Sequence, residues 1–181
     1  MNTQNELFSP LPLSAAFTGY RISKLPFEPT EENIARLKKK LNEAVKALYE
    51  RGFRIFYSGM CNGVDIWGAE VVLELKKDCP DVELICAVPF EGHADKLKGE
   101  ELEIYKRITA NALRVDILKG RITYREMARA FNERNKYMVD NSEALIAVCN
   151  KASLTPGGTA NTVKMAEKKG IEIIFVNPEL D

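Results

Sequence analysis

The stretch FRIFYSGMCNGVDIWGAE, residues 53–70, decides the fold of this chain. Its first part, Phe53 to Tyr57, is rich in aromatic and β-branched residues and predicts a β-strand. Ser58-Gly59 breaks that strand, and a helix is expected over about 63–77, where apolar residues recur at helical spacing. A strand that passes through a glycine-rich turn into a helix is the repeating unit of α/β domains.

The same alternation of short apolar runs and helical patterns continues on both sides of this stretch. Further strands are predicted at 14–18, 82–88, 113–118, 144–149 and 171–176, and further helices at 30–51, 94–112, 124–139 and 159–169. The run from Val82 to Val88 contains one acid and is otherwise apolar, which is typical of a strand buried on both faces. We therefore expect an α/β fold with a mostly parallel sheet of about six strands and helices on both faces. No linker or repeat interrupts residues 1–181, so one domain is expected, with a polar N-terminal tail at about 1–12.

Composition excludes several functional classes. The 26 Lys and Arg residues balance the 26 Asp and Glu residues, so a nucleic-acid binder that relies on a basic surface and a polybasic membrane anchor are both disfavoured. No run reaches the roughly 18 apolar residues of a membrane span, and no signal peptide is evident. The four cysteines, Cys61, Cys79, Cys86 and Cys149, form no CxxC pair, so we expect no metal site. They are interpreted as reduced thiols of a cytoplasmic protein.

Two junctions that follow predicted strands carry residues suited to an anionic ligand. Parallel sheets bind ligands beyond the carboxyl ends of their strands, near the point where the strand order reverses. At the first junction, Thr18 ends the strand, Gly19 permits a tight turn with close approach of the backbone, and Arg21 can clamp an anion or remain solvated. At the second, Ser58, Gly59 and Gly63 lead into a helix N-terminus, an arrangement that predicts a phosphate cradle.

Two carboxylates accompany the second junction. Asp65 falls in the first turn of the helix, where it can cap the helix or contact a ribose or a water molecule. Glu70 lies about one turn further on and can act as a base or sit at the solvent boundary.

A third junction, PGGTANT at residues 156–162, repeats the glycine-rich pattern at another helix N-terminus. Gly157 and Gly158 allow close approach of a ligand to the backbone, and Thr159 and Thr162 supply hydroxyl groups. Two such loops on one sheet suggest a ligand with several phosphates, or with a phosphate and a ribose.

Arg134 shares the apolar stripe of its helix with Met127, Phe131 and Met138. An inward-facing arginine must be paired, because an isolated buried charge is very costly. Arg134 is thus either part of a structural ion pair or directed at a bound phosphate or ribose. The single histidine, His93, is expected in a loop and is interpreted as solvated.

The motifs TGYR at 18–21, SGMCNGVDIWGAE at 58–70, RNKYMVD at 134–140 and PGGTANTVKMAEKKGIEIIFV at 156–176 together resemble the YpsA-like family of the SLOG superfamily. This superfamily also holds the LOG phosphoribohydrolases and the DNA-processing protein A fold. The resemblance implies a three-layer Rossmann-like domain with a nucleotide-type ligand, such as an ADP-ribose-like molecule or a nucleoside monophosphate. It also implies that the chain can form a homodimer.

LOG enzymes carry the loop PGGxGTxxE, whose Glu serves in cleavage of the N-glycosidic bond. Here the loop reads PGGTANTVK, with Lys164 or a neighbouring residue in place of that Glu. The leading hypothesis is therefore a cytoplasmic protein that binds and senses or processes a nucleotide derivative. The alternative is an N-glycosidic hydrolase of nucleoside monophosphates that uses Glu70 and Asp65. A third hypothesis is an interaction module on the charged segment 91–106, or a single-stranded DNA binder.

Overall fold

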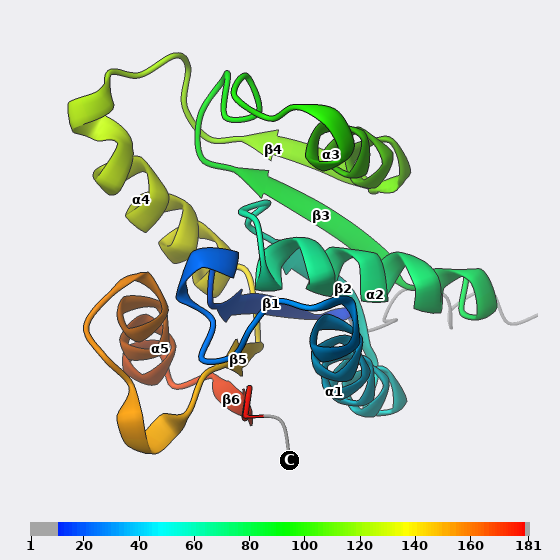
Figure 1. The fold of residues 1–181 in the computed structure, drawn as a ribbon. Helices are drawn as coiled ribbons and strands as arrows, with labels where there is room; N and C mark the ends of the chain where they lie inside the picture. The colour runs from blue at the N-terminus through cyan, green and yellow to red at the C-terminus, as the bar shows by residue number, and fades with distance from the viewer. Residues whose placement is uncertain (1–10, 180–181) are drawn as a thin grey trace, which may run out of the picture.

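The computed structural model describes residues 11–179 and contains one six-stranded sheet in the order β4-β3-β2-β1-β5-β6 (Figure 1). The strands are β1 (Leu13–Gly19), β2 (Phe53–Ser58), β3 (Glu83–Val88), β4 (Arg114–Ile117), β5 (Ala144–Val148) and β6 (Glu172–Val176). The helices are α1 (Glu31–Glu50), α2 (Val64–Asp78), α3 (Gly99–Asn111), α4 (Met127–Asp140) and α5 (Gly158–Lys169). The predicted tail at about 1–12 lies outside the described residues up to position 10.

All neighbouring strands pair in parallel, so the predicted α/β class and parallel sheet are confirmed. Strands β2, β3 and β4 are added in succession on one side of β1, whereas β5 and β6 lie on its other side. The strand order therefore reverses between β1 and β5, where Gly19 pairs with Val148. The carboxyl ends of these two strands define the position in which α/β sheets bind ligands.

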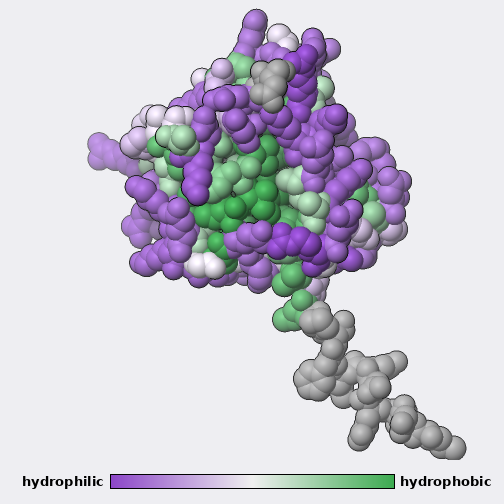
Figure 2. Space-filling view, turned by 90° about the horizontal axis from the view of Figure 1, so that it is seen from below, coloured by the Kyte–Doolittle hydropathy of each residue, from purple (hydrophilic) through white to green (hydrophobic). Residues whose placement is uncertain are grey.

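Helices cover both faces of the sheet, as the sequence predicts (Figure 1). Leu37, Leu41, Val45 and Leu48 of α1 join α2 and the centre of the sheet in the larger core, which also holds Ile108 of α3. The opposite face packs Met138 and Val139 of α4, and Val163 and Ala166 of α5, into the smaller core. Figure 2 views the molecule from the side of the edge strand β6 and shows an apolar centre within a polar surround.

A local signal explains the start of α1, whereas two other helices begin later than expected. The Oγ1 atom of Thr30 accepts the Asn33 N–H at 3.2 Å, so Thr30 caps α1 as expected. The helix expected from about residue 94 begins only at Gly99, because the preceding chain forms tight turns that include the hydrogen bond from Asp95 N–H to the Gly92 carbonyl. Likewise α4 begins at Met127, after a separate 3₁₀ turn at Tyr124–Glu126.

No helix within residues 11–179 is both long enough and apolar enough to cross a bilayer.

Candidate functional site

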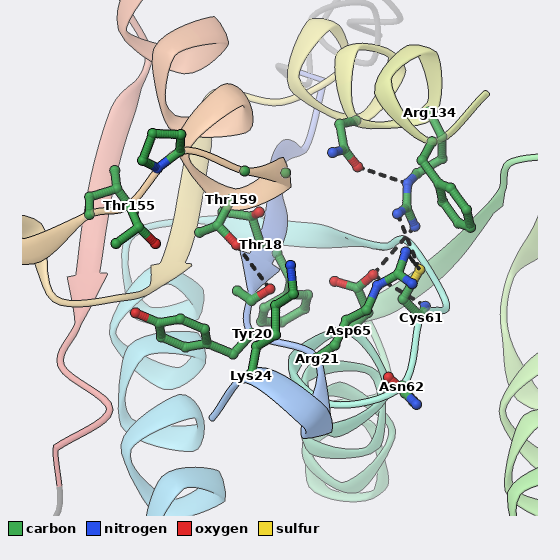
Figure 3. A pocket seen from close by; sticks show the side chains of 18 residues that line it. Thr18, Tyr20, Arg21, Lys24, Cys61, Asn62, Asp65, Arg134, Thr155 and Thr159 are labelled. Atoms are coloured by element: carbon green, nitrogen blue, oxygen red, sulfur yellow. Dashed lines mark hydrogen bonds and ion pairs between the residues drawn. The ribbon is translucent and has the colours of Figure 1, made fainter. Parts of the chain in front are cut away.

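A polar pocket of about 160 Å³ lies at the carboxyl end of β1, beside the reversal of strand order (Figure 3). Its walls come from the segment after β1, the loop after β2, helix α4 and the loop that leads into α5. We call it the switch-point pocket. It is lined by Phe17, Thr18, Gly19, Tyr20, Arg21, Lys24, Cys61, Asn62, Asp65, Phe131, Arg134, Asn135, Leu154, Thr155, Pro156, Gly157, Gly158 and Thr159.

The structure brings together most of the residues that the sequence nominates. Those that line the switch-point pocket are Thr18, Gly19, Arg21, Asp65, Arg134, Gly157, Gly158 and Thr159. Those that do not line it are Ser58, Gly59, Gly63, Thr162 and Glu70. Lys24 is the main addition: it follows the TGYR motif by three residues, and Figure 3 shows its side chain directed toward Thr18.

In the loop at 58–65, which the sequence nominates as a phosphate cradle, three N–H groups already have protein acceptors. The Met60 N–H donates to Ser58 Oγ at 3.2 Å, and the Cys61 N–H donates to Asp65 Oδ2 at 3.2 Å. The Val64 N–H, at the start of α2, donates to the Tyr20 carbonyl at 3.1 Å. These three donors are thus engaged within the protein, and their hydrogen bonds position the side chains of Cys61 and Asp65.

Two glycines hold this loop close to its neighbours. Gly63 has φ +90°, which L-residues rarely adopt, and a Cβ there would lie 3.0 Å from Arg21 Cα and closer still to the Tyr20 carbonyl oxygen. A Cβ on Gly59 would overlap the guanidinium of Arg134. Both glycines therefore allow the close packing that forms one wall of the site, although neither lines the pocket.

Arg134 is the most enclosed polar residue of the site, with 4% of its surface exposed. Its Nη1 donates to the Gly59 carbonyl and lies 3.3 Å from Asp65 Oδ2, while its Nε donates to Asn135 Oδ1 at 2.9 Å. Its Nη2 lies 3.4 Å from Cys61 Sγ. The two roles expected for an inward Arg134 thus combine, because it is ion-paired and also borders the pocket.

Burial shapes the titration of the Asp65–Arg134 pair. Burial raises the pKa of the Asp65 carboxyl, although the nearby Arg134 charge and the Cys61 N–H favour its ionised form. Burial on its own would lower the pKa of Arg134, but the interactions with Cys61 and Asp65 raise it by more. The net pKa is therefore raised, and the guanidinium stays charged. Asp65 is the one carboxylate among the residues that line the pocket.

Two further cations reach the pocket without a carboxylate partner among residues 11–179. Arg21 stacks over the ring of Phe131, 4.8 Å from its centroid, and its Nη2 lies 3.7 Å from Cys61 Sγ. Lys24 lies in the short 3₁₀ turn η1 (Ile22–Lys24) that follows β1. Neither side chain forms an ion pair in the described part of the chain, so both charges remain available to a ligand.

The N-terminus of α5 forms the opposite wall, and no side chain in the described part of the chain caps it. Gly157 precedes the helix and Gly158 begins it, and both line the pocket. Thr159 Oγ1 donates to the Gly19 carbonyl at 3.0 Å and ties this wall to β1 (Figure 3). Thr162 Oγ1 instead donates to the Gly158 carbonyl at 2.8 Å, inside the helix. An uncapped helix N-terminus with glycines attracts anions through its N–H groups and its dipole.

The structure does not bring Glu70 to this pocket. Its two carboxylate oxygens pair with Lys38 Nζ at 2.7 Å and Arg107 Nη2 at 2.6 Å, on the surface formed by α1, α2 and α3. Glu70 is therefore held by two cations outside the candidate site.

His93 is more enclosed than its loop position suggests. Its ring contacts the rings of Phe90, Tyr105 and Phe131, and its buried Nδ1 atom has no hydrogen-bond partner within residues 11–179. Burial, together with the charges of Arg134 and Arg21, lowers the pKa of His93 to about 4. The ring is thus neutral at physiological pH and packs behind Phe131, which lines the pocket.

Comparison with known proteins agrees with the fold and the motifs. Residues 15–179 match the model of the YspA SLOG family, named YpsA. A UPF0398 protein of Bacillus thuringiensis (strain Al Hakam) is 32% identical over 157 residues, which is 86% of this chain and 83% of that protein. A UPF0398 protein of Bacillus cereus (strain AH187) matches with the same identity and coverage. The chain therefore belongs to the YpsA family of SLOG proteins.

Proposed function

We propose that this chain binds a nucleotide or a nucleotide-derived molecule, with a phosphate group in the switch-point pocket. The observation that carries the proposal is that Arg21 and Lys24 line the same pocket as the N-terminus of α5, which no side chain of residues 11–179 caps. The Arg134 and Asp65 charges offset each other, so Arg21 and Lys24 leave the pocket positive in a chain of zero net charge. Phosphate is the common biological anion that such an arrangement fits.

The neighbourhood of the pocket also suits a ribose. Thr18, Asn62 and Asn135 add hydroxyl and amide groups to its lining, and these can exchange hydrogen bonds with sugar hydroxyls. The position beside the reversal of strand order is the one that nucleotides occupy in parallel α/β sheets.

Binding is better supported than N-glycosidic hydrolysis. Hydrolysis needs a carboxylate that is free to act at the sugar. Glu70 is held by Lys38 and Arg107 away from the pocket, and Asp65 is engaged by Arg134 and the Cys61 N–H. A sensing role that depends on ligand binding needs neither group to react.

Isothermal titration with AMP, ADP and ADP-ribose tests the proposal. Replacement of both Arg21 and Lys24 by Ala is expected to weaken binding by more than about tenfold, because each loses a charge-assisted contact with phosphate. The matched control replaces Arg125 and Lys39, which are exposed and lie outside the pocket, and should retain the affinity of the parent chain. Failure of all three compounds to bind, or full affinity in the Arg21→Ala/Lys24→Ala variant, would refute the proposal. Chromatography of the same mixtures for released base tests the hydrolytic alternative.

A further inference from the structure

A second cavity, of about 350 Å³, lies between α2 and α3 close to the switch-point pocket. Its apolar walls are formed by Ile22, Ile66, Trp67, Leu97, Ile104 and Tyr105, and charged residues, Glu70 among them, complete its lining. We call it the aromatic cavity. Its lining differs sharply from that of the switch-point pocket, which gathers cations, glycines and hydroxyl groups.

The two compartments adjoin each other. Asn62 lines both of them, and Figure 3 shows it on the side of the switch-point pocket away from Thr155 and Thr159. The short segment after β1 forms the rest of the boundary between them, because Arg21 and Lys24 line the pocket whereas Ile22 lines the cavity. Because Asn62 is exposed, a molecule bound beside Arg21 can extend over it at the surface toward the cavity that Trp67 and Tyr105 line.

The volumes of the two compartments also fit different parts of a nucleotide. The switch-point pocket, at about 160 Å³, falls below the roughly 300–1,000 Å³ of pockets that enclose whole drug-sized ligands. A phosphate and a sugar match a pocket of this volume, and a base needs further space beside it. The aromatic cavity, at about 350 Å³, has the size and the apolar walls that a planar base requires.

We propose that the ligand spans both compartments, with its phosphate and ribose in the switch-point pocket and its nucleobase in the aromatic cavity. This inference rests on the proposed function and adds the base to it. A second phosphate is a poor occupant of the cavity, because its cations, Lys38 and Arg107, are already paired with Glu70.

Two carboxylates at the rim of the aromatic cavity indicate which kind of base it prefers. Glu100 and Glu101 line it from the first turn of α3, and neither forms an ion pair or a side-chain hydrogen bond in the described part of the chain. Free carboxylates accept hydrogen bonds but cannot donate them. They therefore favour a base that presents amino groups, such as adenine or guanine.

Trp67 makes the inference testable, because it is the single tryptophan of the chain and lines the cavity. Titration with AMP should change its fluorescence, whereas ribose 5-phosphate should bind without such a change. AMP should also bind at least about tenfold more tightly than ribose 5-phosphate, since stacking of one base contributes on this scale.

The variant Ile104→Phe fills part of the cavity from the half-buried face of α3. It should lower the affinity for AMP toward that for ribose 5-phosphate and leave the latter unchanged, which also shows that the variant is folded. Equal affinities of the two compounds in the parent chain, with Trp67 unaffected, would overturn this inference while the proposed function stands. Failure of both compounds to bind would overturn the two together.

Discussion

Arg134 Nη1 lies 3.3 Å from Asp65 Oδ2, and this buried ion pair joins α4 to the first turn of α2. The side chains are 5% and 11% exposed, so water screens the pair very little. The same guanidinium also donates to the Gly59 carbonyl, and the same carboxylate accepts the Cys61 N–H. The pair therefore fixes the loop after β2 and thereby one wall of the switch-point pocket.

Removal of one member of this pair should destabilise the fold strongly. Arg134→Met leaves Asp65 buried without its cation, and a broken buried pair costs about 3–5 kcal/mol. Urea unfolding at neutral pH measures the change in the free energy of unfolding. The double variant Asp65→Asn/Arg134→Met should recover part of the loss, because it leaves no uncompensated charge. Additive effects of the two single changes would show that the pair is not coupled.

Gly59 should tolerate no side chain, because Arg134 occupies the space beside it. Gly59→Ala places a Cβ against the guanidinium and 2.7 Å from Asp65 Oδ2, so the pair must shift. Overpacking of this kind costs about 1–3 kcal/mol. Gly120→Ala is the matched control, since no atom lies within 4 Å of a Cβ there. Thermal unfolding of the two variants should show a clear loss only for Gly59→Ala, and equal melting temperatures would contradict this packing.

His93 should make the protein less stable in acid. Its pKa is about 4 in the folded chain, against 6.5 ordinarily, because the ring is buried near Arg134 and Arg21. As the pH falls from 6.5 to 4, the unfolded chain takes up a proton that the folded chain rejects, so the free energy of unfolding decreases. This shift corresponds to at most about 3 kcal/mol, and the partial exposure of the ring reduces it.

The variant His93→Phe keeps an aromatic ring among Phe90, Tyr105 and Phe131 but has no proton to bind. Urea unfolding of both proteins at pH 7 and pH 4.5 isolates the contribution of the histidine, since their carboxylates are identical. The parent chain should lose more stability than the variant between these two pH values. An equal loss in both would show that His93 titrates normally.

The fold was predictable because each strand and helix carries a local signal. The apolar run at 82–88 and the cap at Thr30 lead to β3 and α1 with little error. The starts of α3 and α4 were less predictable, because the turns at 92–97 and 124–126 are closed by local hydrogen bonds, such as Asp95 N–H to the Gly92 carbonyl and Glu126 N–H to the Thr123 carbonyl, in sequences that are also compatible with a helix.

The candidate site was predictable only in part, for a physical reason. Glycine-rich motifs reveal where a helix begins, and they located Gly157 and Gly158 correctly at the start of α5. They do not reveal whether the N–H groups are free, and the loop at 58–65 turned out to bond internally through Asp65 and Tyr20. Glu70 had the right chemistry, but its partners Lys38 and Arg107 come from α1 and α3, and such pairings leave no trace in local sequence.

Cys61 should report occupancy of the switch-point pocket. It is one of four cysteines and the one that lines the pocket, where Arg21 and Arg134 both contact its sulfur. A phosphate-bearing ligand bound beside Arg21 should block access to this thiol and slow its alkylation by iodoacetamide. Cys79, at the carboxyl end of α2 and half-buried, provides an internal control in the same sample.

Peptide mass spectrometry after timed alkylation, with and without AMP, measures both rates at once. AMP should slow modification of Cys61 and leave that of Cys79 unchanged, because a ligand in the pocket covers only the first thiol. The protection should disappear in the Arg21→Ala/Lys24→Ala variant, which retains Cys61 but lacks the two free cations. Protection of both cysteines to the same degree would indicate a general rise in stability instead. Protection of neither, at AMP concentrations that saturate binding, would place the ligand outside this pocket.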